Sequence, residues 1–423
     1  MLPAIILFAI TYILMLTFSK YRPLIALGSG LIFIVTGMLP LEQIIPALDF
    51  NVLLMIAGTM GLVALFIESK MPALLADLIM ERVPNVRWAA VSLALFAGVI
   101  SAFVDNVATV LMVAPVALAI CKKLKTNPVP FIIGIAVSSN LQGAATLVGD
   151  TTAIMLGSAL DMSFTDFFWY EGKPSIFFAV ELGALLSAAI LYYMFRKEKA
   201  PIPKASERTK VTDFVPTVLL CGTIVLLIVA SFIPNKPNET NGLICCGLLV
   251  IGIIYNYARK RTKASIIAPL KEIDVQTLGL LVGLFLMIGG ITNMGVIDAA
   301  AALLAKTGGG NVFLLYTVIV WASVLISAFI DNIPYVATMI PVIGGLAAKL
   351  GVDPTPLYFG LLSGATLGGN ITPIGASANI TGIGILRREG YEVKNADFFR
   401  LGIPFTLAAI IPAYIYIWLV YGV

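Results

Sequence analysis

Long apolar runs separated by short polar loops make up most of the chain. A helix needs about 20 apolar residues to cross a hydrocarbon core of about 30 Å. Runs that fit one crossing, or one crossing with a break, fall at residues 2–18, 23–40, 50–68, 128–160, 174–195, 214–233, 241–258, 275–293, 355–386 and 402–422. The pattern predicts an all-α polytopic membrane protein with about 10 spanning helices, in which the lipid bilayer is the solvent of most of the surface.

Two further apolar stretches, residues 88–121 and 311–348, do not fit a single crossing. Arg87 precedes the first stretch and Lys122 and Lys123 follow it, so both of its ends are predicted to face the cytoplasm. At 1.5 Å per residue each stretch can form two arms of about 20–25 Å. We therefore expect two re-entrant hairpins, with tips near residues 101–106 and 327–332, that enter from opposite faces.

Basic residues set the predicted orientation of the spans. Lys20 and Arg22 follow the first run, which places that loop in the cytoplasm and the N-terminus outside. With the spans above, only four of the 27 Lys and Arg residues lie outside: Lys173, Lys236, Lys306 and Lys349. The charge pattern predicts a multi-pass protein of the cell inner membrane with both termini outside.

The two halves of the chain repeat each other. The sequence from Ser101 to Asn106, SAFVDN, returns as SAFIDN 226 residues later, and Gly143, Thr146 and Gly149 have counterparts at the same offset. Because the halves are predicted to have opposite orientation, we expect an inverted-topology repeat, as in many secondary transporters. The predicted division is a first repeat over 1–200, a cytoplasmic linker over 201–213 and a second repeat over 214–423.

The composition agrees with a membrane protein and limits the partners and the proton-transferring groups that the chain can use. Hydrophobic residues make up 59% of the chain and charged residues 12%, against about a quarter charged in a soluble domain. The net charge of +4 is too small to indicate a nucleic-acid partner. The chain has no histidine, so proton transfer within it would fall to carboxylates.

Each hairpin tip carries an Asp-Asn pair, Asp105-Asn106 and Asp331-Asn332. An aspartate at membrane depth costs about 2.5–3.5 kcal/mol on insertion scales. Asp is also a good N-cap for the second arm of a hairpin, but Ser or Thr could cap without a charge. The pairs therefore favour a binding function in addition to capping.

The run that follows each hairpin is rich in Gly, Thr and Asn at its centre, around residues 139–152 and 368–379. This density predicts a broken helix in 128–160 and in 355–386, whose unwound centre frees carbonyl groups. A packing seam of small residues is the alternative, but it leaves Asp150, Asn370 and Asn379 unexplained.

Tip and broken helix together predict one half-site in each repeat. The expected ion- or substrate-binding residues are Asp105, Asn106, Thr109, Asn140, Thr146 and Asp150 in the first, and Asp331, Asn332, Asn370, Thr372, Ser377 and Asn379 in the second. Their oxygen atoms suit a hard cation such as Na⁺, or a proton. No Lys or Arg occurs in either segment, which disfavours a tightly held anion. No other cofactor and no metal centre is expected.

The motifs SAFVDNVATVLMVAPV, GAATLVGD, SAFIDNIPYVATMIPV, GGNITPIGASAN and DFFRLG resemble the ion transporter superfamily. The likeness is to the branch with arsenite permeases, one class of Na⁺/H⁺ antiporters and the melanosomal P protein, and more distantly to divalent-anion/sodium symporters. It implies a scaffold, a mobile domain that carries both hairpins, elevator-type alternating access and a homodimer. This chain departs from the usual Gly-Asp-Pro-Pro-Asn at Gly149-Asp150-Thr151-Thr152-Ala153, which puts a ligand role at Ala153 in doubt.

The leading hypothesis is a proton- or sodium-coupled secondary transporter, most simply a cation/proton antiporter. Proton-coupled efflux of arsenite or silicic acid is the main alternative, sodium-coupled organic-anion transport comes third, and a passive channel is a further possibility. The cargo is thus an inorganic cation, a metalloid or a small anion. An intramembrane aspartyl protease would need Gly-x-Gly-Asp where this chain has Leu147-Val148-Gly149-Asp150, so we do not expect an enzyme.

Overall fold

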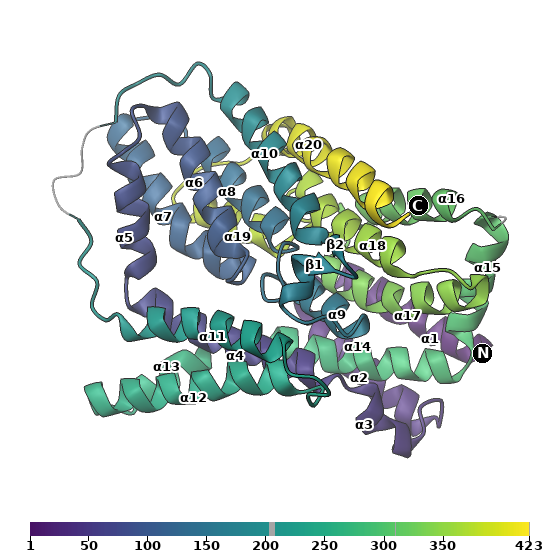
Figure 1. The fold of residues 1–423 in the computed structure, drawn as a ribbon. Helices are drawn as coiled ribbons and strands as arrows, with labels where there is room; N and C mark the ends of the chain where they lie inside the picture. The colour runs from purple at the N-terminus through teal and green to yellow at the C-terminus, as the bar shows by residue number, and fades with distance from the viewer. Residues whose placement is uncertain (203–207, 309, 423) are drawn as a thin grey trace.

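The protein folds almost entirely into helices, as the apolar pattern predicts. A computed structural model describes residues 1–202, 208–308 and 310–422 (Figure 1). Within this part of the chain, the strands form one two-stranded antiparallel hairpin, β1 (Trp169–Tyr170) and β2 (Lys173–Pro174), with Trp169 opposite Pro174. The predicted linker 201–213 lies partly outside the described residues, at 203–207.

Both predicted hairpin stretches form a helix, a short turn and a second helix. The first pair is α6 (Val86–Ser101) and α7 (Asn106–Leu124), and the second is α16 (Val312–Ser327) and α17 (Asn332–Leu350). Asp105 and Asp331 are the N-caps of the second arms, at equivalent positions in the two turns. The side of the membrane from which each hairpin enters stays a prediction.

Both predicted broken helices are interrupted at their centres. Residues 143–150 separate α8 (Val129–Gln142) from α9 (Thr151–Ala159), while η4 (Gly369–Ile371) and an irregular segment separate α18 (Thr355–Gly368) from α19 (Ser377–Arg388). Glycine is required where the unwound chain folds back on itself. A Cβ on Gly149 would lie 2.7 Å from the Gly143 carbonyl oxygen, and one on Gly375 would lie 2.6 Å from that of Gly369.

The remaining long apolar helices coincide with predicted spans. Five of them are long and apolar enough to cross a membrane alone: α4 (Phe50–Glu68), α10 (Ile176–Met194), α12 (Thr240–Lys260), α14 (Val275–Asn293) and α20 (Asn395–Tyr421). The shorter α11 (Val215–Ser231) occupies the predicted run 214–233. The second arms of the two hairpins, α7 and α17, meet the same length and hydropathy criteria.

The N-terminal region differs from the prediction of two full crossings at 2–18 and 23–40. α1 (Leu2–Thr17) and α2 (Arg22–Val35) are joined by η1 (Ser19–Tyr21) and bend by 117°. Their lengths correspond to about 24 and 21 Å, short of a hydrocarbon core of about 30 Å. By length and composition the pair together fits at most one broken span. Hydropathy alone could not show where this bend falls.

Several short helices lie in segments that were predicted to connect the spans. They are η2 (Leu41–Gln43), α3 (Ile44–Ala47), α5 (Met71–Met80), η3 (Thr165–Phe167), α13 (Ala264–Lys271) and α15 (Val296–Gly308). α5 packs on α7, and α15 packs on α17, so each covers the second arm of the hairpin that follows it. Their apolar stretches are too short to be recognised as spans.

Packing follows the sequence repeat. α2 packs along α14 and α12 along α4, and we call these four helices the frame. α6 packs along α8, α16 along α18, and α10 along α20. The hairpins, the broken helices, α10 and α20 form the hairpin group, which lies beside the frame (Figure 1). The two groups meet at the tip of the first hairpin, where the candidate site is found.

Candidate functional site

A cavity of about 570 Å³ separates the frame from the hairpin group at the tip of α7. α4, the end of α13 and the start of α14 form one wall, and both hairpin tips and both broken helices contribute to the other. Six of the predicted site residues line it: Asp105, Asn106, Asn140, Asp150, Asn332 and Ser377. In the described part of the chain, none of its lining residues is Lys or Arg.

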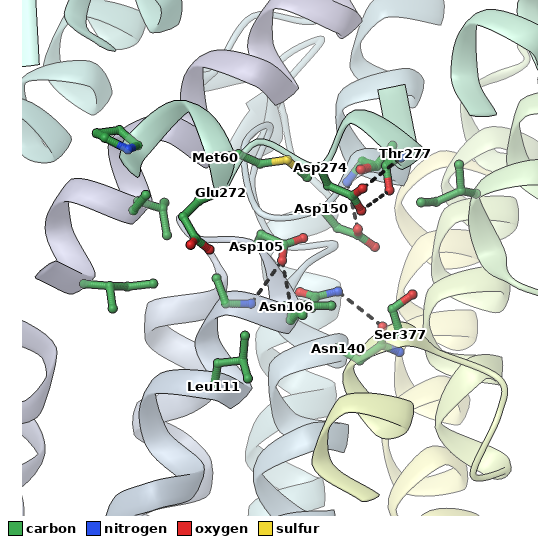
Figure 2. Close-up of a pocket in the computed structure, with 18 of the residues that line it drawn as sticks. Met60, Asp105, Asn106, Leu111, Asn140, Asp150, Glu272, Asp274, Thr277 and Ser377 are labelled. Atoms are coloured by element: carbon green, nitrogen blue, oxygen red, sulfur yellow. Dashed lines mark hydrogen bonds between the residues drawn. The ribbon is translucent and has the colours of Figure 1, made fainter. Parts of the chain in front are cut away.

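Asp105 is fixed by the turn that begins α7. One of its carboxylate oxygens accepts hydrogen bonds from the backbone N–H groups of Val107 at 2.9 Å and Ala108 at 3.1 Å. The side chain therefore has the capping role, and it also faces the cavity (Figure 2). No ion pair to Asp105 occurs among the residues that the structure describes.

A chain of buried amides connects the first hairpin tip to both broken helices. Asn106 Nδ2 donates to Asn140 Oδ1 at 3.3 Å, and Asn140 Nδ2 donates to Asn370 Oδ1 at 3.0 Å. Asn370 in turn donates to the carbonyl oxygen of Val137 at 3.0 Å. Asn106 and Asn140 line the cavity, and Asn370 lies behind them as a fully buried link.

Asp150 connects the first broken helix to the second hairpin. It caps α9 by accepting from Thr151 N at 2.7 Å, and its second oxygen accepts from Thr152 Oγ1 at 3.0 Å. That same oxygen accepts from Asn332 Nδ2 at 3.2 Å. Residues from both repeats thus meet at one carboxylate that is 8% exposed and lines the cavity.

Asp331 does not line this cavity, unlike its counterpart Asp105. It forms an ion pair with Arg22, whose Nη1 lies 3.1 Å from Asp331 Oδ2. We expected no Lys or Arg in either cluster of site residues. In the folded chain this expectation is wrong for the second cluster, because Arg22 lies beside Asp331. It failed because Arg22 is more than 300 residues away in the sequence, and the bend between α1 and α2 brings it to the tip. Arg22 was predicted to lie in a loop between two spans, but it is the first residue of α2.

Three other predicted residues, Thr146, Thr372 and Asn379, have structural contacts and do not line the cavity. Thr146 and Thr372 donate to the hairpin carbonyl oxygens of Ala102 and Ala328, which are equivalent positions in the two repeats. Asn379 Nδ2 donates to the carbonyl oxygens of Gly369 and Thr372, at 2.9 and 3.0 Å. These contacts fasten each unwound segment to its hairpin or to itself.

The last two predicted site residues, Thr109 and Ser377, do not make hydrogen bonds that fasten an unwound segment. Thr109 is fully buried on α7, one turn after the tip, and its hydroxyl has no hydrogen-bond partner among the described residues. Ser377 lies at the first position of α19, is exposed and contributes to the cavity wall.

Three acidic residues of the opposite wall were missed as site residues. Glu68, Glu272 and Asp274 line the cavity, and Figure 2 shows Glu272 and Asp274 gathered with Asp105 and Asp150 around the same space. Glu68 also forms an ion pair with Lys260. One of these residues could have been noticed in the sequence, because Asp274 is the repeat counterpart of Asp49. Both residues cap the helix that follows them, α14 and α4 respectively.

Two further cavities lie near other acidic residues. One of about 870 Å³ is lined by Asp49, Ser158 and the middle of α17 at Ala337 and Ile340, but by no hairpin-tip residue. The other is a small cavity of about 50 Å³ beside Glu181 of α10. Glu181 is therefore separate from the candidate site. Within the described residues no group of three His, Cys, Asp or Glu side chains is arranged to hold a metal ion.

The helical fold, the apolar spans and the polar cavity between two helix groups define a membrane transporter. The citrate transporter family CitMHS matches residues 12–361 and 248–423, and the chain belongs to this family of the ion transporter superfamily. The predicted resemblance is thereby confirmed.

Related sequences agree with this assignment. A 46 kDa membrane protein of Mycobacterium leprae is 34% identical over 325 residues, which cover 76% of this chain and 74% of that protein. An uncharacterized transporter of Mycobacterium tuberculosis is 29% identical over 99% of this chain and 98% of its own length. The human P protein is 26% identical over 86% of this chain and 52% of its own length.

Two solved structures share the fold. The YdaH transporter of Alcanivorax borkumensis is superimposed with a TM-score of 0.59 at 13% identity, over 89% of this chain and 87% of that one. MtrF of Neisseria gonorrhoeae, from a class of antimetabolite efflux pumps, gives a TM-score of 0.58 at 15% identity, over 97% of this chain and 84% of that one. At these identities the likeness concerns the fold alone.

Proposed function

We propose that this protein is a cation-coupled secondary transporter, in its simplest form an antiporter that exchanges a small cation such as Na⁺ for a proton. The observation that carries the proposal is the charge of the cavity wall. Asp105, Asp150, Glu272 and Asp274 line it without a Lys or Arg among the described lining residues. Carboxylates gathered in a partly enclosed space attract cations strongly, because the surrounding protein screens charge less than water does.

Exchange follows from the position of Asp105. Its carboxylate has no ion-pair partner among the described residues and is held in place by two backbone N–H groups. Its charge can be balanced either by a proton on the carboxylate or by a metal cation beside it. The arrival of the cation then releases the proton, and the reverse step returns it. The amide and carboxylate oxygens of Asn106, Asn140 and Asp150 are ligands that hard cations favour.

The arrangement of the helix groups supports an elevator-type movement. Asp105 and Asp150 belong to the hairpin group, while Glu68 and Asp274 are at the ends of frame helices. Movement of the hairpin group along the frame would carry the cation from this cavity to the other side. We expect the frame to remain fixed, as the stationary part of a homodimer in the inner membrane.

The proposal is tested in proteoliposomes that enclose a pH-sensitive dye. After an acidic interior is established, addition of NaCl or LiCl outside should raise the internal pH, while choline chloride should not. Asp105→Asn removes the exchangeable charge but keeps a capping side chain, and it should abolish the response. Asp397→Asn, an exposed aspartate in the first turn of α20, is the matched control and should respond like the wild type. An Asp105→Asn protein with wild-type rates would refute the mechanism.

An organic anion is a second candidate, favoured by the citrate transporter family to which the chain belongs. The acidic cavity would repel free citrate, so this cargo would have to enter with enough cations to balance its charge. The same vesicles distinguish the two candidates. Uptake of labelled citrate only in the presence of metal cations supports cotransport, whereas cation/proton exchange without citrate supports the antiporter. Uptake of arsenite against its gradient, without any response to cations, would favour the metalloid hypothesis.

A further inference from the structure

The two hairpin tips have the same sequence pattern but different electrostatic partners. Asp105 faces the cavity without an ion pair among the described residues, while Asp331 is 3.1 Å from the guanidinium of Arg22. The side chains of Arg22 and Asp331 are 21% and 13% exposed. An ion pair that is largely removed from water is screened less than a surface pair, so its two charges remain strongly coupled.

Arg22 is held by two groups that belong to different elements. Its Nε donates to the carbonyl oxygen of Met15 at 3.2 Å, in the last turn of α1, where carbonyl groups lack helical partners. Arg22 is itself the first residue of α2, the helix end at which a positive charge is unfavourable. Met15 and Asp331 therefore offset an otherwise poor position, and the bend of 117° between α1 and α2 brings both within reach.

The first hairpin tip has no matching arginine among the described residues. α2 packs on α14, and α12 packs on α4. α12 is therefore the repeat counterpart of α2 in the frame. Gly283 of α14 packs against Ala26 of α2, as Gly58 of α4 packs against Cys245 of α12, so the counterpart of Arg22 in α12 is the uncharged Asn241. Among the described residues, the frame therefore supplies a cation to the tip at Asp331 and none to the tip at Asp105.

We propose that Arg22 acts as a tethered cation that neutralises Asp331, so that this conformation binds a free cation at the Asp105 half-site only. The inference rests on the proposed function and specifies its stoichiometry. A site with two open acidic tips would bind two cations. In this chain the guanidinium takes the place of the second one, and the negative charge that remains for exchange lies on the cavity side.

Cation counting by thermal unfolding tests this inference without any transport assay. Each bound cation stabilises the folded state by RT ln(1 + [L]/Kd), so well above Kd the melting temperature rises with log concentration in proportion to the number of sites. The purified protein is titrated with NaCl or LiCl at constant ionic strength, with choline chloride as the replacement salt. Arg22→Gln frees Asp331 and should double the slope. The Arg22→Gln, Asp331→Asn double variant should return to the wild-type slope.

Two further variants keep the test decisive if Arg22→Gln folds poorly. Arg22→Lys keeps the charge and should keep the wild-type slope. Asp331→Asn should also keep the wild-type slope. Its melting temperature should begin to rise at a higher cation concentration, because the unpaired Arg22 repels the cation. A slope that falls in Asp331→Asn, or that stays unchanged in Arg22→Gln, overturns the tethered-cation role. A wild-type protein that no cation stabilises, with Asp105→Asn indistinguishable from it, would instead remove the proposed function and this inference together.

Discussion

Asn140 donates a hydrogen bond to Asn370 across 3.0 Å, and this contact joins the broken helix of the first repeat to that of the second. The same Nδ2 also donates to the carbonyl oxygen of Thr366 at 2.6 Å. Asn140 is 1% exposed and Asn370 is fully buried. The link therefore belongs to the interior of the hairpin group, directly behind the cavity wall, and ties the two half-sites into one unit.

Replacing Asn140 should destabilise the hairpin group. Asn140→Ala leaves Asn106 Nδ2, Asn370 Oδ1 and the Thr366 carbonyl each without a bond that Asn140 now makes. A buried polar group without a partner costs about 1–3 kcal/mol. We expect a clearly lower melting temperature in detergent, measured by intrinsic fluorescence. Asn238→Ala, in an exposed loop, is the control and should melt like the wild type. Equal melting temperatures for the two variants would contradict the link.

The sequence repeat made much of the fold predictable. The hairpin boundaries, the tip caps Asp105 and Asp331 and the interruptions of both long helices follow from local patterns that occur twice. A local pattern is readable because turns, caps and unwound segments depend on neighbouring residues. The repeat also correctly grouped Thr146 with Thr372, although both fasten the backbone instead of lining the cavity.

Long-range contacts could not be predicted in the same way. Arg22 and Asp331 have no sequence relationship, and the pairing depends on a bend whose angle hydropathy does not encode. The acidic wall at Glu272 and Asp274 lies in a segment assigned to the loop side of a span. Its closeness to Asp105 results from the packing of α14 beside α4, which a one-dimensional pattern does not contain.

The threonine contacts at the two unwound segments should be equivalent. Thr146 and Thr372 each donate to a hairpin carbonyl, at Ala102 and Ala328. Thr146→Val and Thr372→Val keep the shape but remove the donor, so each should lose about 1 kcal/mol of stability. Thr146→Ser and Thr372→Ser retain the hydroxyl and should lose less. Melting temperatures of the four variants measure this, and a large effect confined to one repeat would show that the fastening is not shared.

Glycine at position 375 should be far less replaceable than glycine at position 384. In Gly375→Ala the new Cβ would lie 2.6 Å from the Gly369 oxygen and 2.8 Å from the Ala328 oxygen, both of the backbone. Because backbone atoms cannot rotate away, we expect a loss of about 1–3 kcal/mol and a reduced transport rate. Gly384→Ala, in α19, meets nothing within 4 Å and should be neutral or stabilising by up to about 1 kcal/mol. Thermal unfolding and vesicle transport compare the pair, and equal behaviour would show that the unwound segment tolerates a side chain.

The acidic wall contributed by the frame should tune the affinity for the cation. Asp274 caps α14 through Gln276 N and Thr277 N, at 3.0 and 3.1 Å, and it also lines the cavity. Asp274→Asn keeps a capping side chain but removes one negative charge from the wall. In a partly solvated site such a charge contributes on the order of 1 kcal/mol, which corresponds to a roughly fivefold to tenfold weaker apparent affinity.

Asp49 supplies the matched control for this prediction, because it is the repeat counterpart of Asp274 and caps α4 in the same way. It lines the other cavity, which contains no hairpin-tip residue, so Asp49→Asn should leave the cation concentration for half-maximal exchange unchanged. Both variants lose one charge from one helix cap, and the two charges face different cavities. A fivefold or larger shift in Asp274→Asn alone would therefore locate the exchanged cation at the Asp105 side. Similar shifts in both would mean that the effect comes from the caps or from the overall charge of the protein.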